Sequence, residues 1–260
     1  MTVAEFADTP QIITVDQTKQ IRQGRSRFIA MAGAYSLGNF NDNFMKQAVS
    51  LLAVSHGLAH LQGWIATFFT IPFLFFSAPA GWMADRFSRK HVVIGSKALE
   101  LVLLTVAAVG VLTLNWFLIM AVIFLMALQA TIFGPALVGS IPDVYPEWYV
   151  IKANARLKAA TTAAILLGVV LAGIALTCRG HIGTYPLGRV IVAASLVGIS
   201  ILGFMISFAV PGRPAANPAA KFPRGGPVNS LRDLWLLRTD RILITAILAN
   251  TYFWFIAALQ

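Results

Sequence analysis

One short stretch of the chain, residues 38–46, gathers polar side chains inside an otherwise apolar run. On a helix, a spacing of i, i+3, i+4 and i+7 places four of them on a single face: Asn39, Asp42, Asn43 and Lys46. Tyr35 lies one turn earlier on the same face. An ionisable group near the middle of a bilayer is costly, so we expect this face to meet water, ligand or protein instead of lipid. Opposite charges on one wall suit a substrate that itself carries both signs.

A second pair of ionisable residues, Lys97 and Glu100, lies at i and i+3 in a later apolar run. The Lys97 ammonium is a candidate partner for a phosphate group. A structural role is also open, because a neutralising pair within one helix needs no ligand and a lysine near a helix end can reach the interface. The predicted translocation residues are therefore Asn39, Asp42, Asn43, Lys46, Lys97 and Glu100.

The elements that must carry these residues are membrane-spanning helices. Of the 260 residues, 58% are hydrophobic and only 12% are charged, and the apolar residues come in runs of about 20. This composition excludes a soluble domain, and the single cysteine, Cys178, excludes a disulfide scaffold. We predict an all-α polytopic membrane protein. Its expected spans are residues 28–55, 64–83, 92–114, 116–141, 161–178, 187–210 and 242–260.

The charges divide between the two sides of these spans. The net charge is +10, yet most lysines and arginines fall in the segments before span one, after spans two and four, and after span six. By the positive-inside rule, the N-terminus and the segment 211–240 are cytoplasmic. Because topology accounts for the basic charge, we expect no nucleic-acid partner.

The spans also define the expected domain organisation. Residues 1–27 form a cytoplasmic tail, residues 28–210 a six-helix bundle, and residues 211–241 a proline-rich and glycine-rich cytoplasmic linker. Residues 242–260 form a seventh helix, which we expect to begin a second half that the chain lacks. No metal-ligand spacing, catalytic triad, nucleotide-binding loop or acyltransferase pattern is evident, so the sequence predicts no cofactor, no metal and no enzymatic activity.

The loop between spans two and three carries a recognisable motif. Residues 81–90 resemble the loop signature of the major facilitator superfamily, G-x-x-x-D-R-x-G-R-K/R, and depart from it at Ser88. The resemblance implies a conformational gate. Gly81 would let helices approach closely, Asp85 would bridge to a neighbouring helix end, and the cations would pair with acidic groups in one conformation only. The expected gate residues are Gly81, Asp85, Arg86, Arg89 and Lys90.

Four further segments give a narrower resemblance. Residues 40–46, the Lys97-x-x-Glu100 pair, residues 133–143, and residues 152–154 with 163–168 resemble the lysophospholipid transporter family. In many bacteria this domain is fused to a glycerophospholipid acyltransferase and an acyl-carrier-protein synthetase. The resemblance covers about residues 27–260. Two positions depart from the family pattern: Leu137-Val138 replaces Lys-Tyr, and Lys158 replaces an acid.

The narrower resemblance implies a function and a location. Family members have twelve spans and move lysophospholipid, chiefly lysophosphatidylethanolamine, to the inner leaflet of the bacterial inner membrane for reacylation. Lys46 or Lys97 would attract the phosphate and Asp42 the ammonium. The implied partners are membrane lipid, the lysophospholipid substrate, and a C-terminal transporter half or an acyltransferase. Rocker-switch transport uses three-helix inverted repeats, although no internal sequence repeat is evident.

Two other functions remain open from the sequence. The first is proton-coupled efflux or metabolite transport, in which Asp42 or Glu100 titrates. The second is an inert membrane-anchor fragment of a bifunctional acyltransferase. Competition by lysolipids would separate the first from lysolipid transport.

Overall fold

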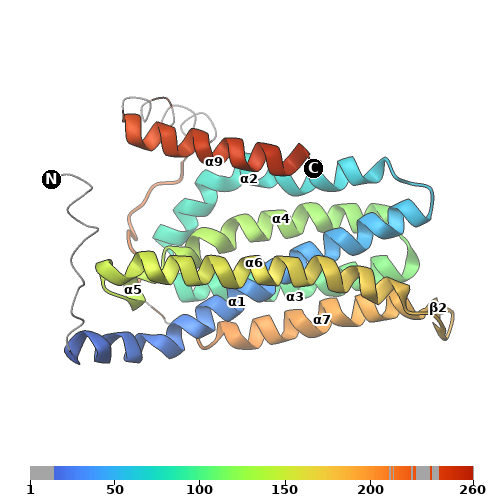
Figure 1. The fold of residues 1–260 in the computed structure, drawn as a ribbon, viewed down its shortest axis with the longest axis horizontal. Coiled ribbons are helices and arrows are strands. Elements are labelled where there is room, and N and C mark those ends of the chain that lie inside the picture. The colour runs from blue at the N-terminus through green and yellow to red at the C-terminus, as the bar shows by residue number, and fades with distance from the viewer. Residues whose placement is uncertain are drawn as a thin grey trace.

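The computed structural model describes residues 15–210, 212, 214–223, 225–226, 235 and 240–259. These residues are almost entirely helical (Figure 1). The helices are α1 (Val15–Ser55), α2 (Leu61–Arg86), α3 (Arg89–Thr113), α4 (Trp116–Val138), α5 (Ile141–Val144), α6 (Glu147–Thr177), α7 (Leu187–Ser207) and α9 (Arg241–Leu259). Two short antiparallel strands, β1 (His181–Ile182) and β2 (Tyr185–Pro186), form a hairpin between α6 and α7.

Among the residues that the structure describes, five helices are long and apolar enough to cross a membrane: α2, α3, α4, α6 and α7. Helix α1 falls outside this set because its polar residues lower its hydropathy, although its 41 residues extend about 60 Å at 1.5 Å per residue. That length exceeds the roughly 30 Å hydrocarbon core of a bilayer. The predicted class, an all-α polytopic membrane protein, is confirmed.

The packing of the long helices has an internal symmetry. Helix α1 packs along α6 as α4 packs along α2, and α3 packs on α7. Helix α3 also packs on α4 as α7 packs on α1. If α1, α2 and α3 are exchanged with α4, α6 and α7, in that order, the same main helix–helix contacts result. This is expected for two three-helix repeats. The sequence shows no such repeat because helix packing requires only similar shape and small residues at the crossings.

The core has two parts along the bundle. One surrounds the second half of α1, where Phe44, Met45 and Val49 pack against residues of α3, α4, α6 and α7. The other lies at the end of the bundle where α5 joins α4 to α6. Helices α1 and α6 approach closely at Gly168, where a Cβ would lie 2.7 Å from the Phe40 carbonyl oxygen.

Two helices extend beyond the predicted membrane spans. Helix α1 begins by Val15, whereas the predicted span begins at residue 28, so residues 15–27 of the predicted tail are helical, and residues 1–14 lie outside the described chain. Helix α6 begins at Glu147 instead of at residue 161. Both extensions are polar, and hydropathy therefore does not detect them.

The α1 extension packs against the α5 segment, which leads into α6. The Phe28 and Tyr145 ring centroids lie 5.4 Å apart, and a Cβ at Gly24 would lie 2.8 Å from the Val144 carbonyl oxygen. The fourth span ends at Val138 instead of at residue 141, and α5 follows as a separate turn. The seventh helix begins at Arg241, and much of the predicted linker lies outside the described residues.

Candidate functional site

A cavity of about 350 Å³ lies within the bundle between α1, α2, α3, α4 and α6. Helix α1 lines it with Tyr35, Gly38, Asn39, Asp42, Asn43 and Lys46. The other lining residues are Phe69 and Phe73 from α2, Glu100 from α3, Gln129, Ala130 and Phe133 from α4, and Ile165 from α6. The polar face predicted from helical spacing therefore forms one wall of a cavity.

The opposite side of α1 fixes the orientation of this wall. Phe40, Phe44, Met45 and Ala48 are buried in the hydrophobic core, and Gly168 allows the α6 backbone to lie directly against α1. Because these apolar residues alternate with the polar ones at helical spacing, burying one face turns the other toward the cavity.

The two asparagine amides of this wall each donate a hydrogen bond within α1. Asn39 Nδ2 donates to the Tyr35 carbonyl oxygen at 2.9 Å, and Asn43 Nδ2 donates to the Asn39 carbonyl oxygen at 2.7 Å. Each side chain keeps its amide oxygen as an acceptor. Within the described part of the chain, the Asp42 carboxylate has no hydrogen bond or ion pair, although it interacts electrostatically with Lys46, Lys97 and Glu100.

Lys46 lies against the aromatic wall of the cavity. Its Nζ is 3.9 Å from the centroid of the Phe69 ring, within the range of a cation–π interaction. Phe69 and Phe73 are one turn apart on α2 and both line the cavity. A cation and a carboxylate therefore lie on one wall, with aromatic rings on a facing helix.

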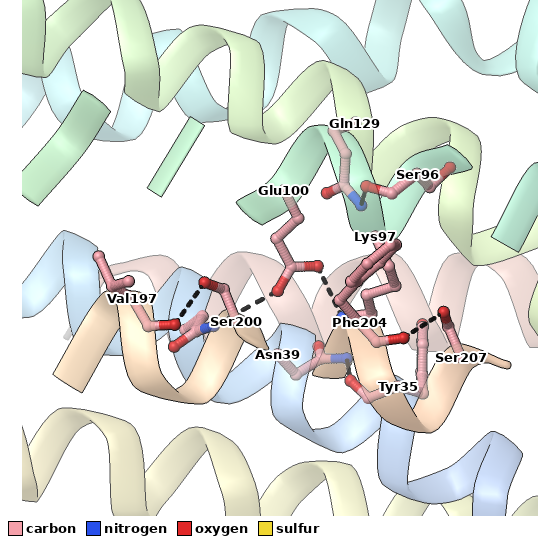
Figure 2. Close-up of polar contacts among 11 residues, drawn as sticks. Tyr35, Asn39, Ser96, Lys97, Glu100, Gln129, Val197, Ser200, Phe204 and Ser207 are labelled. Atoms are coloured by element: carbon pink, nitrogen blue, oxygen red, sulfur yellow. Dashed lines mark hydrogen bonds and ion pairs between the residues drawn. The ribbon is translucent and has the colours of Figure 1, made fainter. Parts of the chain in front are cut away.

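Lys97 and Glu100 form a buried ion pair beside the cavity. Lys97 Nζ lies 2.6 Å from Glu100 Oε2, and the exposed fractions of the two side chains are 0% and 3%. Asn41 Nδ2 donates to Glu100 Oε1 at 3.4 Å, and Lys97 Nζ lies 4.7 Å from the Phe133 ring centroid. Figure 2 shows a dashed line from each oxygen of the Glu100 carboxylate, one of them to Lys97.

Two glycines make room for Lys97. A Cβ at Gly38 of α1 would lie 2.9 Å from Lys97 Nζ, and a Cβ at Gly203 of α7 would lie 3.5 Å from it. The Lys97 ammonium therefore lies between α1 and α7, behind the cavity wall, whereas Glu100 is part of that wall. Of the six predicted translocation residues, the structure brings five to the cavity and connects Lys97 to it through Glu100.

Several cavity residues are not among the predicted translocation residues. Gln129 lines the cavity, and its Nε2 donates to the Ser96 carbonyl oxygen at 3.0 Å. Phe69 and Phe73 of the aromatic run 68–76 also line the cavity. Their i, i+4 spacing places them on one face of α2 but does not show what that face meets.

The C-terminal end of α2 contacts the segment that follows α7. Trp82 Nε1 and Arg86 Nη1 both donate to the Ala220 carbonyl oxygen, at 3.0 and 2.7 Å. The backbone N–H of Asn217 donates to the Asp85 carbonyl oxygen at 2.9 Å. The Trp82 and Phe222 rings meet edge to face with centroids 5.2 Å apart.

The remaining gate residues have different surroundings. Arg89 donates to the Gly139 carbonyl oxygen at the end of α4, and a Cβ at Gly212 would lie 3.2 Å from Lys90 Cδ. Two of the contacts expected for the motif are not made among the described residues in this conformation. A Cβ at Gly81 would meet no described atom within 4 Å, and the exposed Asp85 takes part through its backbone instead of through a carboxylate bridge to a helix end.

The comparison with protein families identifies the class. The family model of the Major Facilitator Superfamily matches residues 26–259, and the chain therefore belongs to this superfamily. It is a multi-pass membrane protein and a secondary transporter of the major facilitator type. A comparison with curated proteins found no match.

Proposed function

We propose that the protein transports lysophospholipids and that lysophosphatidylethanolamine is its preferred substrate. The observation that carries this proposal is the presence of Asp42 and Lys46 in one cavity, opposite aromatic side chains. A phosphate is attracted by Lys46 and an ammonium by Asp42. The narrow sequence resemblance described above supports the same substrate class.

The size of the cavity also fits this substrate. At about 350 Å³ it lies near the lower end of the usual range for ligand pockets, roughly 300–1,000 Å³. It can hold a polar head group, while the acyl chain lies along apolar helix surface. Helix α2 offers such a surface, since Leu74, Phe75 and Phe76 are exposed beside the cavity-lining Phe73.

The other predicted residues have supporting roles in this proposal. Asn39 and Asn43 provide amide oxygens for the ammonium, and Glu100 adds negative charge to the wall. Lys97 holds Glu100 in place and becomes available to phosphate only when that ion pair opens. The α2–α3 junction, with Asp85 and Arg86 at the end of α2 and Arg89 and Lys90 at the start of α3, serves as the conformational gate.

We further propose that the protein lies in a bacterial inner membrane with its N-terminus in the cytoplasm, where an acyltransferase consumes its substrate. The distribution of lysines and arginines supports this orientation. In a Cys178→Ser background, a membrane-impermeant maleimide added to intact cells should label Ile182→Cys and spare Lys221→Cys. The reverse pattern would contradict the orientation.

Proton-coupled efflux or metabolite transport is the second candidate function. It is favoured by the Asp42 carboxylate, which has no hydrogen-bond or ion-pair partner among the described residues and faces the cavity. A carboxylate in this position can exchange a proton with an aqueous pathway. In that case uptake or efflux would follow an imposed proton gradient, and lysolipids would not compete.

The test of the proposed function is uptake of labelled lysophosphatidylethanolamine into spheroplasts. Asp42→Asn removes the charge at constant size, and we expect it to reduce uptake at least tenfold at equal membrane expression. Gln47→Asn, on the same helix but outside the cavity lining, is the matched control and should leave uptake unchanged. Normal uptake by the Asp42 variant would overturn the proposed role of this wall.

A further inference from the structure

A second cavity, of about 280 Å³, adjoins the first. It shares Tyr35, Asn39 and Ile165 with the cavity described above and adds the polar residues Asn154, Lys158 and Thr161 of α6. The three shared residues make the two spaces neighbours along α1. The second cavity is on the side toward the beginning of α6, because it also reaches Val138, the last residue of α4.

The side chains lining this second cavity favour an anion. Asn154, Lys158 and Thr161 follow one another at i, i+4 and i+7, and therefore lie on one face of α6. The described lining contains one cation and no acidic residue. Tyr35, Asn154 and Lys158 provide hydroxyl, amide and ammonium donors, which suits a phosphate group, while the Thr161 hydroxyl donates to the Lys158 carbonyl oxygen.

Of the three cations in the α6 extension, Lys158 lines the second cavity. Lys152 and Arg156 lie near the Tyr149 ring, with Lys152 Nζ 6.0 Å and Arg156 Cζ 5.7 Å from its centroid. Neither residue lines the second cavity. All three side chains are exposed. Lys158 borders this space because it shares a helical face with Asn154 and Thr161, not because it is more exposed.

We propose that the second cavity, hereafter the Lys158 vestibule, is a phosphate-binding subsite for the transported lysophospholipid. This inference rests on the proposed function and adds a second position for the head group. Asn39, which borders both cavities, precedes Lys46 by seven residues, or about 10 Å along the helix axis. The phosphate is bound near Lys46 in the first cavity and near Lys158 as the head group moves toward the end of the bundle where α6 begins.

The test compares uptake kinetics of the full-length protein in proteoliposomes. The probes are lysophosphatidylethanolamine and a monoacylglycerol with the same acyl chain but no phosphate. Lys158→Glu should raise the KM for the lysophospholipid about tenfold and leave any monoacylglycerol uptake unchanged. Lys158→Arg should restore most of the affinity, and Lys152→Glu, the matched charge reversal outside the vestibule, should change KM less than twofold.

The outcomes separate the vestibule from the proposed substrate. Lysophospholipid uptake with equal KM in Lys158→Glu and Lys152→Glu would overturn the vestibule alone, whereas no uptake by the unmodified protein would overturn both proposals. Inorganic phosphate distinguishes a free anion from a head group. If it blocks uptake at concentrations near the lysophospholipid KM, and only when Lys158 is present, the vestibule is a site for free phosphate and its assignment to the substrate is wrong.

Discussion

The Lys97 ammonium and the Glu100 carboxylate meet at 2.6 Å in the interior of the bundle, and almost none of either side chain is exposed. Both residues lie on α3, but their surroundings come from other helices. Lys97 lies between glycines of α1 and α7, and Glu100 accepts a hydrogen bond from Asn41 of α1. The pair therefore connects the cavity wall to the packing of three helices.

Removing one partner of this pair should destabilise the protein strongly. Lys97→Met leaves the Glu100 carboxylate buried without its cation, which costs about 3–5 kcal/mol in comparable buried pairs. We expect a lower unfolding temperature in detergent and reduced membrane expression. The double variant Lys97→Met with Glu100→Leu should recover most of the loss, because no unpaired charge remains. Equal stability of the single variant and the unmodified protein would show that the pair is not a structural connection.

The glycines of α6 provide a matched pair of substitutions. A Cβ at Gly168 would lie 2.7 Å from the Phe40 carbonyl oxygen and 3.2 Å from the Phe44 amide nitrogen, whereas a Cβ at Gly173 would meet no described atom within 4 Å. Gly168→Ala should therefore destabilise the α1–α6 contact by about 1–3 kcal/mol, the usual cost of overpacking. Gly173→Ala should be neutral or slightly stabilising. Thermal unfolding in detergent measures both, and equal effects would contradict the close approach of the two helices.

The contact between the end of α2 and the segment after α7 can be followed by hydrogen exchange. Trp82→Ala removes a hydrogen bond to the Ala220 carbonyl oxygen and the ring contact with Phe222. The lost hydrogen bond is worth about 1 kcal/mol, so we expect the Asn217 amide to exchange at least fivefold faster. His91→Ala, on the exposed surface of α3, is the control and should leave that amide unchanged. Unchanged exchange in the Trp82 variant would mean that Trp82 does not hold the segment.

The arrangement of α1 could be predicted from the sequence in its main features. Asn39, Asp42, Asn43 and Lys46 share a helical face by spacing alone, and the cost of exposing charge to lipid places that face toward a cavity. The partner wall could not be predicted in the same way. Aromatic residues such as Phe69 and Phe73 have similar sequence patterns whether they face lipid, core or a cavity.

Two other features depended on tertiary contacts that hydropathy does not report. The helical extensions before residue 28 and before residue 161 are polar along much of their length. The first packs at Gly24 against Val144 and Tyr145, and Tyr145 lies against Tyr149 of the second. The burial of Lys97 between Gly38 and Gly203 brings together residues from three helices that are far apart in sequence. Spacing identified the Lys97–Glu100 pair, but only the fold shows which member of it reaches the cavity.

The central claim is that the polar face of α1 borders a water-filled passage used by the substrate. Thiol accessibility tests it most directly, in a Cys178→Ser background with one new cysteine in each variant. Asn43→Cys, on the cavity wall, should react with a water-soluble methanethiosulfonate reagent and be protected by lysophosphatidylethanolamine. Ala48→Cys, on the fully buried side of the same helix, should stay unreactive. An Asn43→Cys thiol that reacts no faster than the one at position 48, or that the lysolipid fails to protect, would contradict the account.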